Sequence, residues 1–183
     1  HLGAGRASLI TYLEVAKDAS GTYPAMVAFD MEHMTTYDSG KKEMVETLKE
    51  YIQMGGIVSF SYHMENPTGN YTSQGVCRGE LGDEAVWEEL ITEGTDLNKR
   101  FKEILSYAGN VLREFDKEGY PVIWRPFHEH NGGWFWWCAI QTFEENGKSV
   151  TRPIDEDSFI ALWRYTYRYF TEELGLKNLV WAY

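Results

Sequence analysis

The chain has 183 residues with 28 acidic and 17 basic side chains, which give a formal net charge of −11. This charge opposes binding to nucleic-acid phosphates and anionic lipid headgroups, so we expect no nucleic-acid partner. No apolar run approaches the roughly 20 residues that a membrane helix requires, so we expect no membrane span. The composition therefore favours a neutral partner, and the length allows one substantial core.

The two cysteines give little information about chemistry or compartment. Cys77 and Cys138 are spaced neither as a metal knuckle nor as a CxxC redox pair. Each is interpreted as a lone thiol, and a disulfide between them stays open.

Four apolar runs bounded by turn residues predict buried strands. They are PAMVAFDM (24–31), GGIVSFSYH (55–63), YPVIWRPFH (120–128) and NLVWAY (178–183). Segments with helical spacing lie before and between them, at about 6–18, 41–54, 95–117 and 155–174. Strands that alternate with helices indicate βαβ units and a parallel sheet, either an open doubly wound sheet or a (β/α)8 TIM barrel.

The positions of polar residues favour the barrel. His63 ends the second run and Glu65 follows it, His128 ends the third run and Glu129 follows it, and the longest loop (about 64–94) leaves the same edge. Barrel enzymes build their sites at this edge, although open sheets also bind ligands there. A barrel needs eight strands and only four are visible. We therefore expect residues 1–183 to be part of a longer catalytic domain, without its first strand and its carboxyl-terminal strands.

Glu129 is the first candidate for chemistry. If the third strand continues that far, Glu129 is in phase with Arg125 and points into the mouth of a barrel. A carboxyl group walled by aromatic rings has a raised pKa and can act as a general acid. The alternative is an ion pair between Glu129 and Arg125 that only stabilises the strand end.

His128 and His130 raise the question of a metal, because an HxH pair at a strand end can place two imidazoles together. The further ligands that a catalytic metal needs are missing from the sequence pattern. We expect neither a metal nor a cofactor.

Four consecutive aromatic residues, 134–137, follow the glycines at 132 and 133. Aromatic faces suit the C–H surfaces of pyranose rings, and Asn131 can bind sugar hydroxyls. Adjacent residues cannot all face one groove, so at least two of the four rings are expected to pack in the core. Trp134 is the one expected to line the groove.

The second run ends in a similar way. Ser59, Ser61 and His63 share a small polar face that suits a barrel interior near a ligand. His63 either binds a hydroxyl or satisfies a loop carbonyl. A weaker polar set after the first run is interpreted as a solvated or capping cluster: Asp30, Glu32 and His33.

RPFHEHNGGWFWW, with GGIVSFSYHMENP upstream and NLVWAY downstream, resembles glycoside hydrolase family 26. The best-known members of this family are endo-β-1,4-mannanases, and its fold is a (β/α)8 barrel. The resemblance implies that Glu129 is the general acid/base and that His128 supports the nucleophile through a hydrogen bond. It also implies that Trp134 lines the sugar subsite at the cleavage point.

The same resemblance implies roles for three further residues. His63 matches a residue of the cleavage subsite, while Arg125 and Asn131 fall on positions that hold the acid/base in place. The nucleophile of the family is a Glu on a later strand, beyond the end of this sequence. We therefore expect the isolated segment to be inactive.

The implied activity is retaining, endo-acting hydrolysis of mannan-type polysaccharides or oligosaccharides by a monomeric enzyme. Secretion, or a periplasmic location, is expected because a polysaccharide cannot reach a cytosolic enzyme. The alternatives are a non-catalytic carbohydrate-binding barrel, or a glycanase that acts on mixed-linkage β-glucan or β-1,3-xylan.

Overall fold

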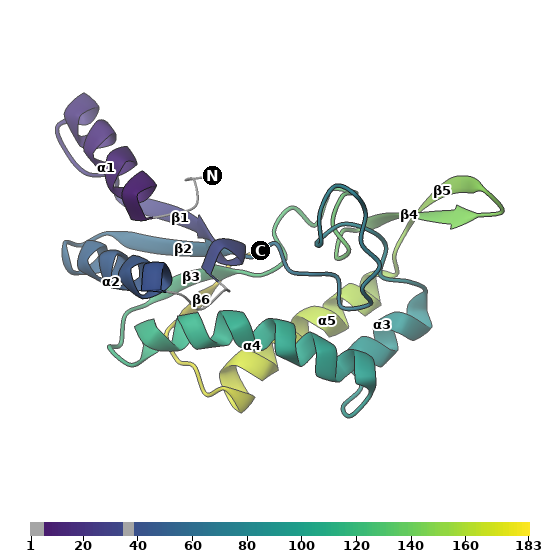
Figure 1. The fold of residues 1–183 in the computed structure, drawn as a ribbon. Helices are drawn as coiled ribbons and strands as arrows, with labels where there is room; N and C mark the ends of the chain where they lie inside the picture. Colours follow the sequence, from purple (N-terminus) through teal and green to yellow (C-terminus); the bar gives the residue numbers. More distant parts are fainter. Residues whose placement is uncertain (1–5, 35–38) are drawn as a thin grey trace. The chain divides into compact units, whose positions relative to one another are not determined.

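A four-stranded parallel sheet in the order β1-β2-β3-β6 organises the computed structural model, which describes residues 6–34 and 39–183 (Figure 1). Neighbouring strands pair in parallel throughout. The strands are β1 (Met26–Asp30), β2 (Ile57–Ser61), β3 (Val122–Arg125) and β6 (Leu179–Trp181). The predicted parallel α/β sheet and its four predicted strands are confirmed, with shorter strands than the apolar runs indicate.

The chain divides into two compact units. The first comprises His1–His63, Ala108–Pro126 and Leu176–Tyr183, and it contains the parallel sheet. The second comprises Met64–Tyr107 and Phe127–Gly175. The second unit contains most of the loop residues that the sequence singles out.

The predicted helices are also confirmed. In the first unit, α1 (Arg6–Ser20) precedes β1, a short 3-10 helix η1 (Met31–Met34) follows it, and α2 (Ser39–Gln53) leads to β2. The described residues begin with α1 at residue 6.

The other predicted helices are α4, α5 and η2. Helix α4 (Asp96–Asp116) contributes residues to both units, while α5 (Glu156–Arg168) and the π-helical turn η2 (Tyr169–Glu173) lie in the second. No helix within the ranges 6–34 and 39–183 is long and apolar enough to cross a membrane.

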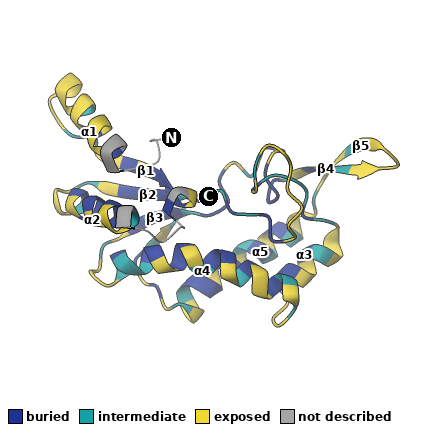
Figure 2. Cartoon of the chain, in the orientation of Figure 1, coloured by how far each residue is buried: buried dark blue, intermediate teal, exposed yellow. Residues whose placement is uncertain are grey.

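The core of the first unit is built from one face of α2 and the buried side chains of the sheet (Figure 2). Met44, Leu48 and Tyr51 repeat at helical spacing and are all buried. Phe60 on β2 is fully buried, and its ring centroid lies 5.6 Å from that of Phe115 in an edge-to-face contact. This packing fixes the end of β2, from which the polar residues follow.

Helix α3 (Glu84–Ile91) is an element that the sequence interpretation misses, because it lies within the segment expected to be a long loop. The carboxylate of Asp83 accepts a hydrogen bond from the backbone N–H of Val86 and so caps the helix. Trp87 and Leu90 are buried three residues apart. The sequence does contain this signal, but the helix is short enough to be read as loop.

The β4–β5 hairpin is the second missed element. Strands β4 (Ile140–Glu145) and β5 (Lys148–Pro153) pair in antiparallel fashion. The two turn residues, Asn146 and Gly147, have φ values of 53° and 71°. Asn-Gly is the preferred pair for a type I′ turn, which needs positive φ at both positions. This turn signal was available in the sequence.

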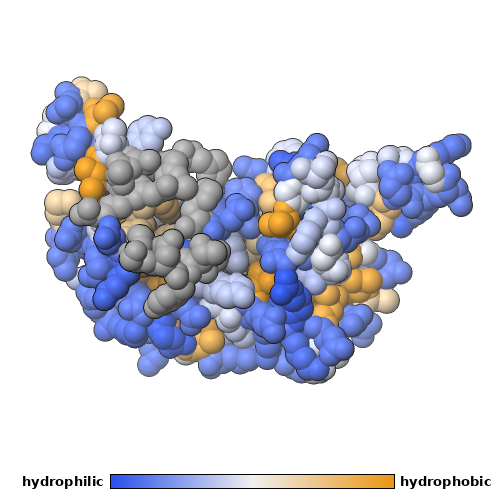
Figure 3. Space-filling model, in the orientation of Figure 1, coloured by the Kyte–Doolittle hydropathy of each residue, from blue (hydrophilic) through white to orange (hydrophobic). Residues whose placement is uncertain are grey.

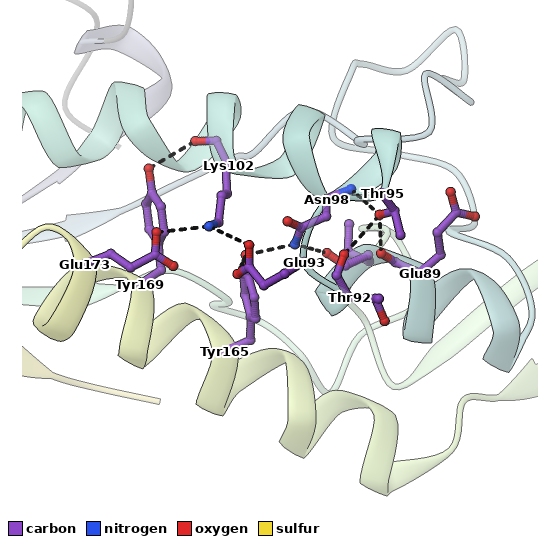
Figure 4. A network of polar contacts seen from close by, with 10 residues as sticks. Glu89, Thr92, Glu93, Thr95, Asn98, Lys102, Tyr165, Tyr169 and Glu173 are labelled. Atoms are coloured by element: carbon purple, nitrogen blue, oxygen red, sulfur yellow. Dashed lines mark hydrogen bonds and ion pairs between the residues drawn. The ribbon is translucent and has the colours of Figure 1, made fainter.

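A polar network in the second unit joins the start of α4 to α5 and η2 (Figure 4). Asn98, which is 1% exposed, donates hydrogen bonds to the carbonyl of Leu90 at 2.9 Å and to the hydroxyl of Tyr165 at 2.8 Å. Lys102 lies between Glu93 at 2.8 Å and Glu173 at 2.9 Å. Burial raises the pKa of Tyr165 to about 12, so its hydroxyl stays protonated.

Replacing Asn98 with Ala should therefore destabilise the complete protein by about 1–3 kcal/mol, because a buried carbonyl and a buried hydroxyl lose a partner. The free energy of unfolding in urea measures this loss. Lys99→Ala is the matched control, since it removes an exposed ion pair with Asp96 one residue further along the same helix. Equal stabilities of the two variants would contradict a structural role for Asn98.

Candidate functional site

In the first unit, the ends of β1 and β2 bring Asp30 and His63 together. The Oδ2 atom of Asp30 lies 2.6 Å from Nδ1 of His63 and accepts a hydrogen bond from Ser61 Oγ at 2.8 Å. Its Oδ1 atom accepts from the backbone N–H groups of Glu32 at 2.9 Å and His63 at 3.2 Å. Asp30 thus fixes both the backbone and the imidazole of His63 with one carboxylate.

Asp30 was interpreted as part of a solvated or capping cluster, and the solvated interpretation is wrong, because the residue is 3% exposed. It does cap the backbone at Glu32. The signal that was missed is that Asp30 ends β1, which pairs with β2, and His63 follows the end of β2. Glu32 is exposed, and the side chain of His33 lies outside the described part of the structure.

The charge on Asp30 is stabilised by its partners. Burial alone would raise its pKa, but the hydrogen bond and charge of His63, with the bonds from Glu32 and Ser61, lower the pKa to about 2. As the donor to this carboxylate, Nδ1 carries the proton of His63, and Nε2 is therefore the acceptor of the neutral ring. A histidine held in this way has a fixed orientation and tautomer.

Since the folded pKa of Asp30 lies below its unfolded value, the carboxylate contributes stability above about pH 4 and loses it as the pH falls toward 2. We expect Asp30→Asn to lower the free energy of unfolding by about 2 kcal/mol at pH 7. The variant should also lack the decrease in stability that the wild type shows as the pH falls from about 4 toward 2, because that decrease comes from protonation of Asp30. Urea unfolding of the complete protein from pH 7 to pH 2 measures both effects.

Asp157→Asn is the control, because Asp157 is an exposed carboxylate in the first turn of α5. A stability profile for Asp30→Asn that runs parallel to the wild type in acid would contradict the assigned role of Asp30.

In the second unit, Glu129 lies in a turn after β3. Its φ of 58° is in the left-handed region, which few residues other than glycine adopt. Its backbone carbonyl accepts a hydrogen bond from the N–H of Gly132 at 2.9 Å. The expected continuation of the strand to Glu129 is therefore wrong: β3 ends at Arg125, and the turn changes the direction of the chain. The aromatic enclosure expected for Glu129 is also wrong, because the residue is exposed.

Trp134 supplies the close partner of Glu129. Its indole Nε1 donates a hydrogen bond to Oε2 of Glu129 at 2.8 Å. Its ring lies against Gly132, where a Cβ atom would come within 2.5 Å of the indole. Trp134 is 45% exposed, and its place in a groove stays a prediction. An exposed carboxylate and an exposed indole thus share one turn, which depends on a glycine at position 132.

The other three motif rings are buried, which confirms the expected core packing. Phe135, Trp136 and Trp137 are at most 4% exposed. The N–H of Trp136 donates to the carbonyl of Met64 at 3.1 Å, and that of Trp137 donates to the carbonyl of His128 at 2.9 Å. These buried indoles hold the turn from beneath.

His128 belongs to this packed layer. It is 5% exposed, and its ring centroid lies 5.5 Å from Phe135 and 5.8 Å from Trp137. His130 instead stacks on Phe159 at 3.6 Å, and burial lowers its pKa. The two imidazoles of the HxH pair therefore contact different aromatic side chains. The supporting role of His128 toward a nucleophile stays a prediction.

The two residues expected to hold the acid/base have different environments. Arg125 ends β3 and is partly exposed on the face opposite the buried Trp124. Asn131 is exposed, and no hydrogen bond joins its side chain to Glu129 within the described residues of the second unit. Their positioning roles stay predictions.

The loop after β2 packs against the same motif. The backbone N–H of Trp136 donates to the carbonyl of Cys77 at 3.2 Å, and the Arg78 guanidinium lies 5.6 Å from the centre of the Phe135 ring. Within the loop, the fully buried Asn66 donates to the carbonyls of Asn70 at 3.3 Å and Glu80 at 3.0 Å. Asn66 is a structural residue that the sequence interpretation did not select.

Glu65, which was expected at the site edge, pairs with Tyr71 and Arg100. Both cysteines are buried thiols, and no disulfide joins Cys77 to Cys138. Burial raises the pKa of Cys138, which keeps its thiol protonated.

Gly132→Ala should displace the indole of Trp134 from Glu129, because the new Cβ would overlap the ring. In the complete protein we expect this change to shift the Nε1–H signal of Trp134 in the NMR spectrum, because the hydrogen bond to Oε2 of Glu129 is lost. Gly133→Ala is the matched control, since a Cβ there meets Ile140 at ordinary contact distances of 3.6 Å and more. Indole N–H spectra of the wild type and the two variants give the comparison, and equal Trp134 signals for the two glycine variants would contradict the role of Gly132.

A parallel α/β sheet with polar residues directly after the carboxyl ends of its strands is the arrangement found in (β/α)8 barrels. The family model of glycosyl hydrolase family 26 matches residues 7–183, and the chain belongs to this family.

The similar curated proteins include mannanases of two bacteria. The chain is 29% identical to mannan endo-1,4-beta-mannosidase A and B of Caldalkalibacillus mannanilyticus, over 100% of this chain and 35% of that protein. It is 27% identical to mannan endo-1,4-beta-mannosidase of Bacillus subtilis, over 91% of this chain and 45% of that protein.

Solved structures confirm the fold class. GH26A from a Muricauda species superposes with a TM-score of 0.74 and 26% identity, over 93% of this chain and 52% of that one. A Bacillus subtilis mannanase superposes with a TM-score of 0.73 and 26% identity, over 94% and 50% of the two chains. The chain thus spans about a third to a half of the length of these relatives.

Proposed function

We propose that this chain is a segment of a retaining, endo-acting glycoside hydrolase that cleaves β-1,4-mannan, with Glu129 as the general acid/base. The observation that carries the proposal is the hydrogen bond between the exposed Glu129 and the exposed Trp134, in a chain of family 26. The mannan-endo-mannosidase names of the relatives support mannan as the polymer.

The turn geometry is suited to this chemistry. The indole N–H of Trp134 holds Oε2 of Glu129, which restrains a carboxylate that the left-handed turn presents to solvent. The Trp134 ring, 45% exposed, offers an apolar face to a pyranose ring beside that carboxylate. A proton donor and a sugar platform on one rigid turn can place a glycosidic oxygen within reach of the acid.

In the proposed reaction, Glu129 protonates the leaving-group oxygen while a second carboxylate attacks the anomeric carbon. Glu129 then removes a proton from the water that hydrolyses the glycosyl-enzyme. This mechanism needs the second carboxylate about 5–5.5 Å away. We propose that it comes from the part of the protein outside this sequence, which would make the 183-residue segment inactive by itself.

His63, with its orientation fixed by Asp30, is proposed to bind a sugar hydroxyl. Arg125 and Asn131 are proposed to position the acid/base, and His128 to support the nucleophile. The proposal includes a monomeric enzyme that works outside the cytosol, because its polymeric substrate is found there.

One alternative belongs to a different class of function. A non-catalytic carbohydrate-binding barrel would use the same exposed indole without turnover, and it is favoured if the complete protein lacks a second carboxylate. Within the enzyme class, mixed-linkage β-glucan and β-1,3-xylan are the alternative substrates.

Glu129→Ala in the complete protein should lower the hydrolysis of β-1,4-mannan by about 10²–10⁴-fold, because the leaving-group oxygen loses its proton donor. Binding of mannan should be largely unchanged. A substrate with an acidic phenol as leaving group should lose much less, since that group departs without protonation. Reducing-sugar release and phenol release measure the two rates.

Glu114→Ala is the control, because it removes a partly exposed carboxylate of α4 that pairs with Lys117 at 2.5 Å. Full activity of Glu129→Ala would refute the assignment. Retention on mannan without hydrolysis by the wild type would instead favour the binding protein.

A further inference from the structure

A groove beside the β4–β5 hairpin of the second unit is separate from the residues of the Glu129 turn. It has a volume of about 410 Å³, and its walls come from the hairpin, the start of α3 and the start of α5. We call it the hairpin groove. Its chemistry is set by Asp83, Glu84, Trp87, Phe143, Arg152 and Asp155. Sites for small organic molecules have volumes of about 300–1,000 Å³, so the groove can hold a short stretch of sugar rings.

One wall combines an aromatic ring with a fixed guanidinium group. Phe143 on β4 is partly exposed, and the guanidinium carbon of Arg152 on β5 lies 4.2 Å from its ring centroid. The register explains this contact, because Phe143 pairs with Val150 and Arg152 is its diagonal neighbour on the same face. Arg152 also donates to Glu145 at 2.7 Å. The ring and the hydrogen-bond donors therefore have set positions.

The opposite wall carries carboxylates at two helix starts. Asp83 caps α3 through Oδ1, and Asp155 caps α5 through Oδ2, which lies 2.9 Å from the N–H of Ser158. Each capping contact uses one carboxylate oxygen, so the second oxygen can accept from a ligand hydroxyl. Glu84 adds a third acid, and the 3% exposed Trp87 provides an apolar base.

The base of the hairpin is firmly attached to the rest of the second unit. Gln141, 2% exposed, accepts from the N–H of Leu81 at 3.0 Å and donates to the carbonyl of Trp136. The N–H of Ile154 donates to the carbonyl of Ala139 at 2.9 Å. The side chain of Gln141 thus links β4 to Leu81 near the α3 wall, the backbone bond closes the base of the hairpin, and a ligand would meet a preformed site.

We propose that the hairpin groove binds a segment of neutral polysaccharide and so holds the polymer independently of the Glu129 turn. The class of ligand rests on the proposed function, while the groove itself does not. Three acids and the net charge of −11 disfavour an anion. Hydroxyl groups can donate to the carboxylates and accept from Arg152, and the ring of Phe143 suits a pyranose C–H face. The visible surface of the hairpin itself is mainly hydrophilic (Figure 3).

The test uses the complete protein and compares Phe143→Ala/Arg152→Ala with Thr142→Ala. Thr142 is a matched control, since it is exposed on the other face of the same hairpin and contacts Thr151 at 3.0 Å. Affinity electrophoresis in gels with β-1,4-mannan, in a Glu129→Ala background, measures binding to the polymer. Initial rates on mannotetraose, with Glu129 present, measure the hydrolytic site alone.

We expect the double variant to weaken binding to the polymer by about fivefold or more, because a second point of attachment is lost. Its mannotetraose hydrolysis should stay within about twofold of the wild type, which also shows that the fold is intact. Thr142→Ala should change neither quantity.

Unchanged polymer binding by the double variant would overturn the groove inference. Hydrolysis that depends on Glu129 would still support the proposed function in that case. Loss of mannotetraose hydrolysis would make the groove part of the hydrolytic site and overturn its independence. If the wild type neither binds nor hydrolyses mannan, both proposals are refuted.

Discussion

The candidate site depends on the burial of two tryptophans beneath one exposed turn. Trp136 and Trp137 are fully buried, and each indole N–H finds a backbone carbonyl, at Met64 and at His128. An indole buries a large apolar area, but its N–H is costly to leave unpaired, so both requirements must be met in one position. That double requirement fixes the loop after β3, and the exposed Glu129 and Trp134 are held by it.

The turn that carries Glu129 contains two features that do not stabilise the fold. Glu129 adopts a left-handed conformation, which costs free energy in a residue with a Cβ atom. Position 132 is a glycine, and only the absence of a Cβ atom there allows the ring of Trp134 to lie against it. Neither the left-handed Glu129 nor the glycine at position 132 adds apolar packing to the core. Both bring the indole N–H to within 2.8 Å of the carboxylate. Strain of this kind persists only where the surrounding packing, here the buried aromatic layer, determines the conformation.

The first unit solves a different problem, which is to keep a charge in a buried position. Asp30 remains ionised at a strand end because four hydrogen-bond donors or charges converge on its two oxygens. In return it orients His63. The two units therefore present their polar groups by distinct means, a buried carboxylate surrounded by hydrogen-bond donors in one and a strained turn on an aromatic base in the other.

Sequence alone determined the parallel α/β class, the strands and the long helices, because apolar runs and helical spacing are local patterns that burial enforces. The motif RPFHEHNGGWFWW also indicated the family, and the rule that four adjacent rings cannot share one groove correctly placed most of them in the core. The short helix α3 and the Asn-Gly hairpin had local signals too, which were missed because their patterns are brief.

Only the tertiary structure decided how these residues meet. Strand phase could not reveal that the chain leaves the strand after Arg125 and reaches Glu129 in a left-handed turn, because a backbone reversal breaks the two-residue period on which phase depends. Nor could it show that Asp30 lies beside His63, since that contact arises from the pairing of two strands separated by a helix. Periodicity reports which face of an element is buried, whereas contacts between elements distant in sequence depend on packing.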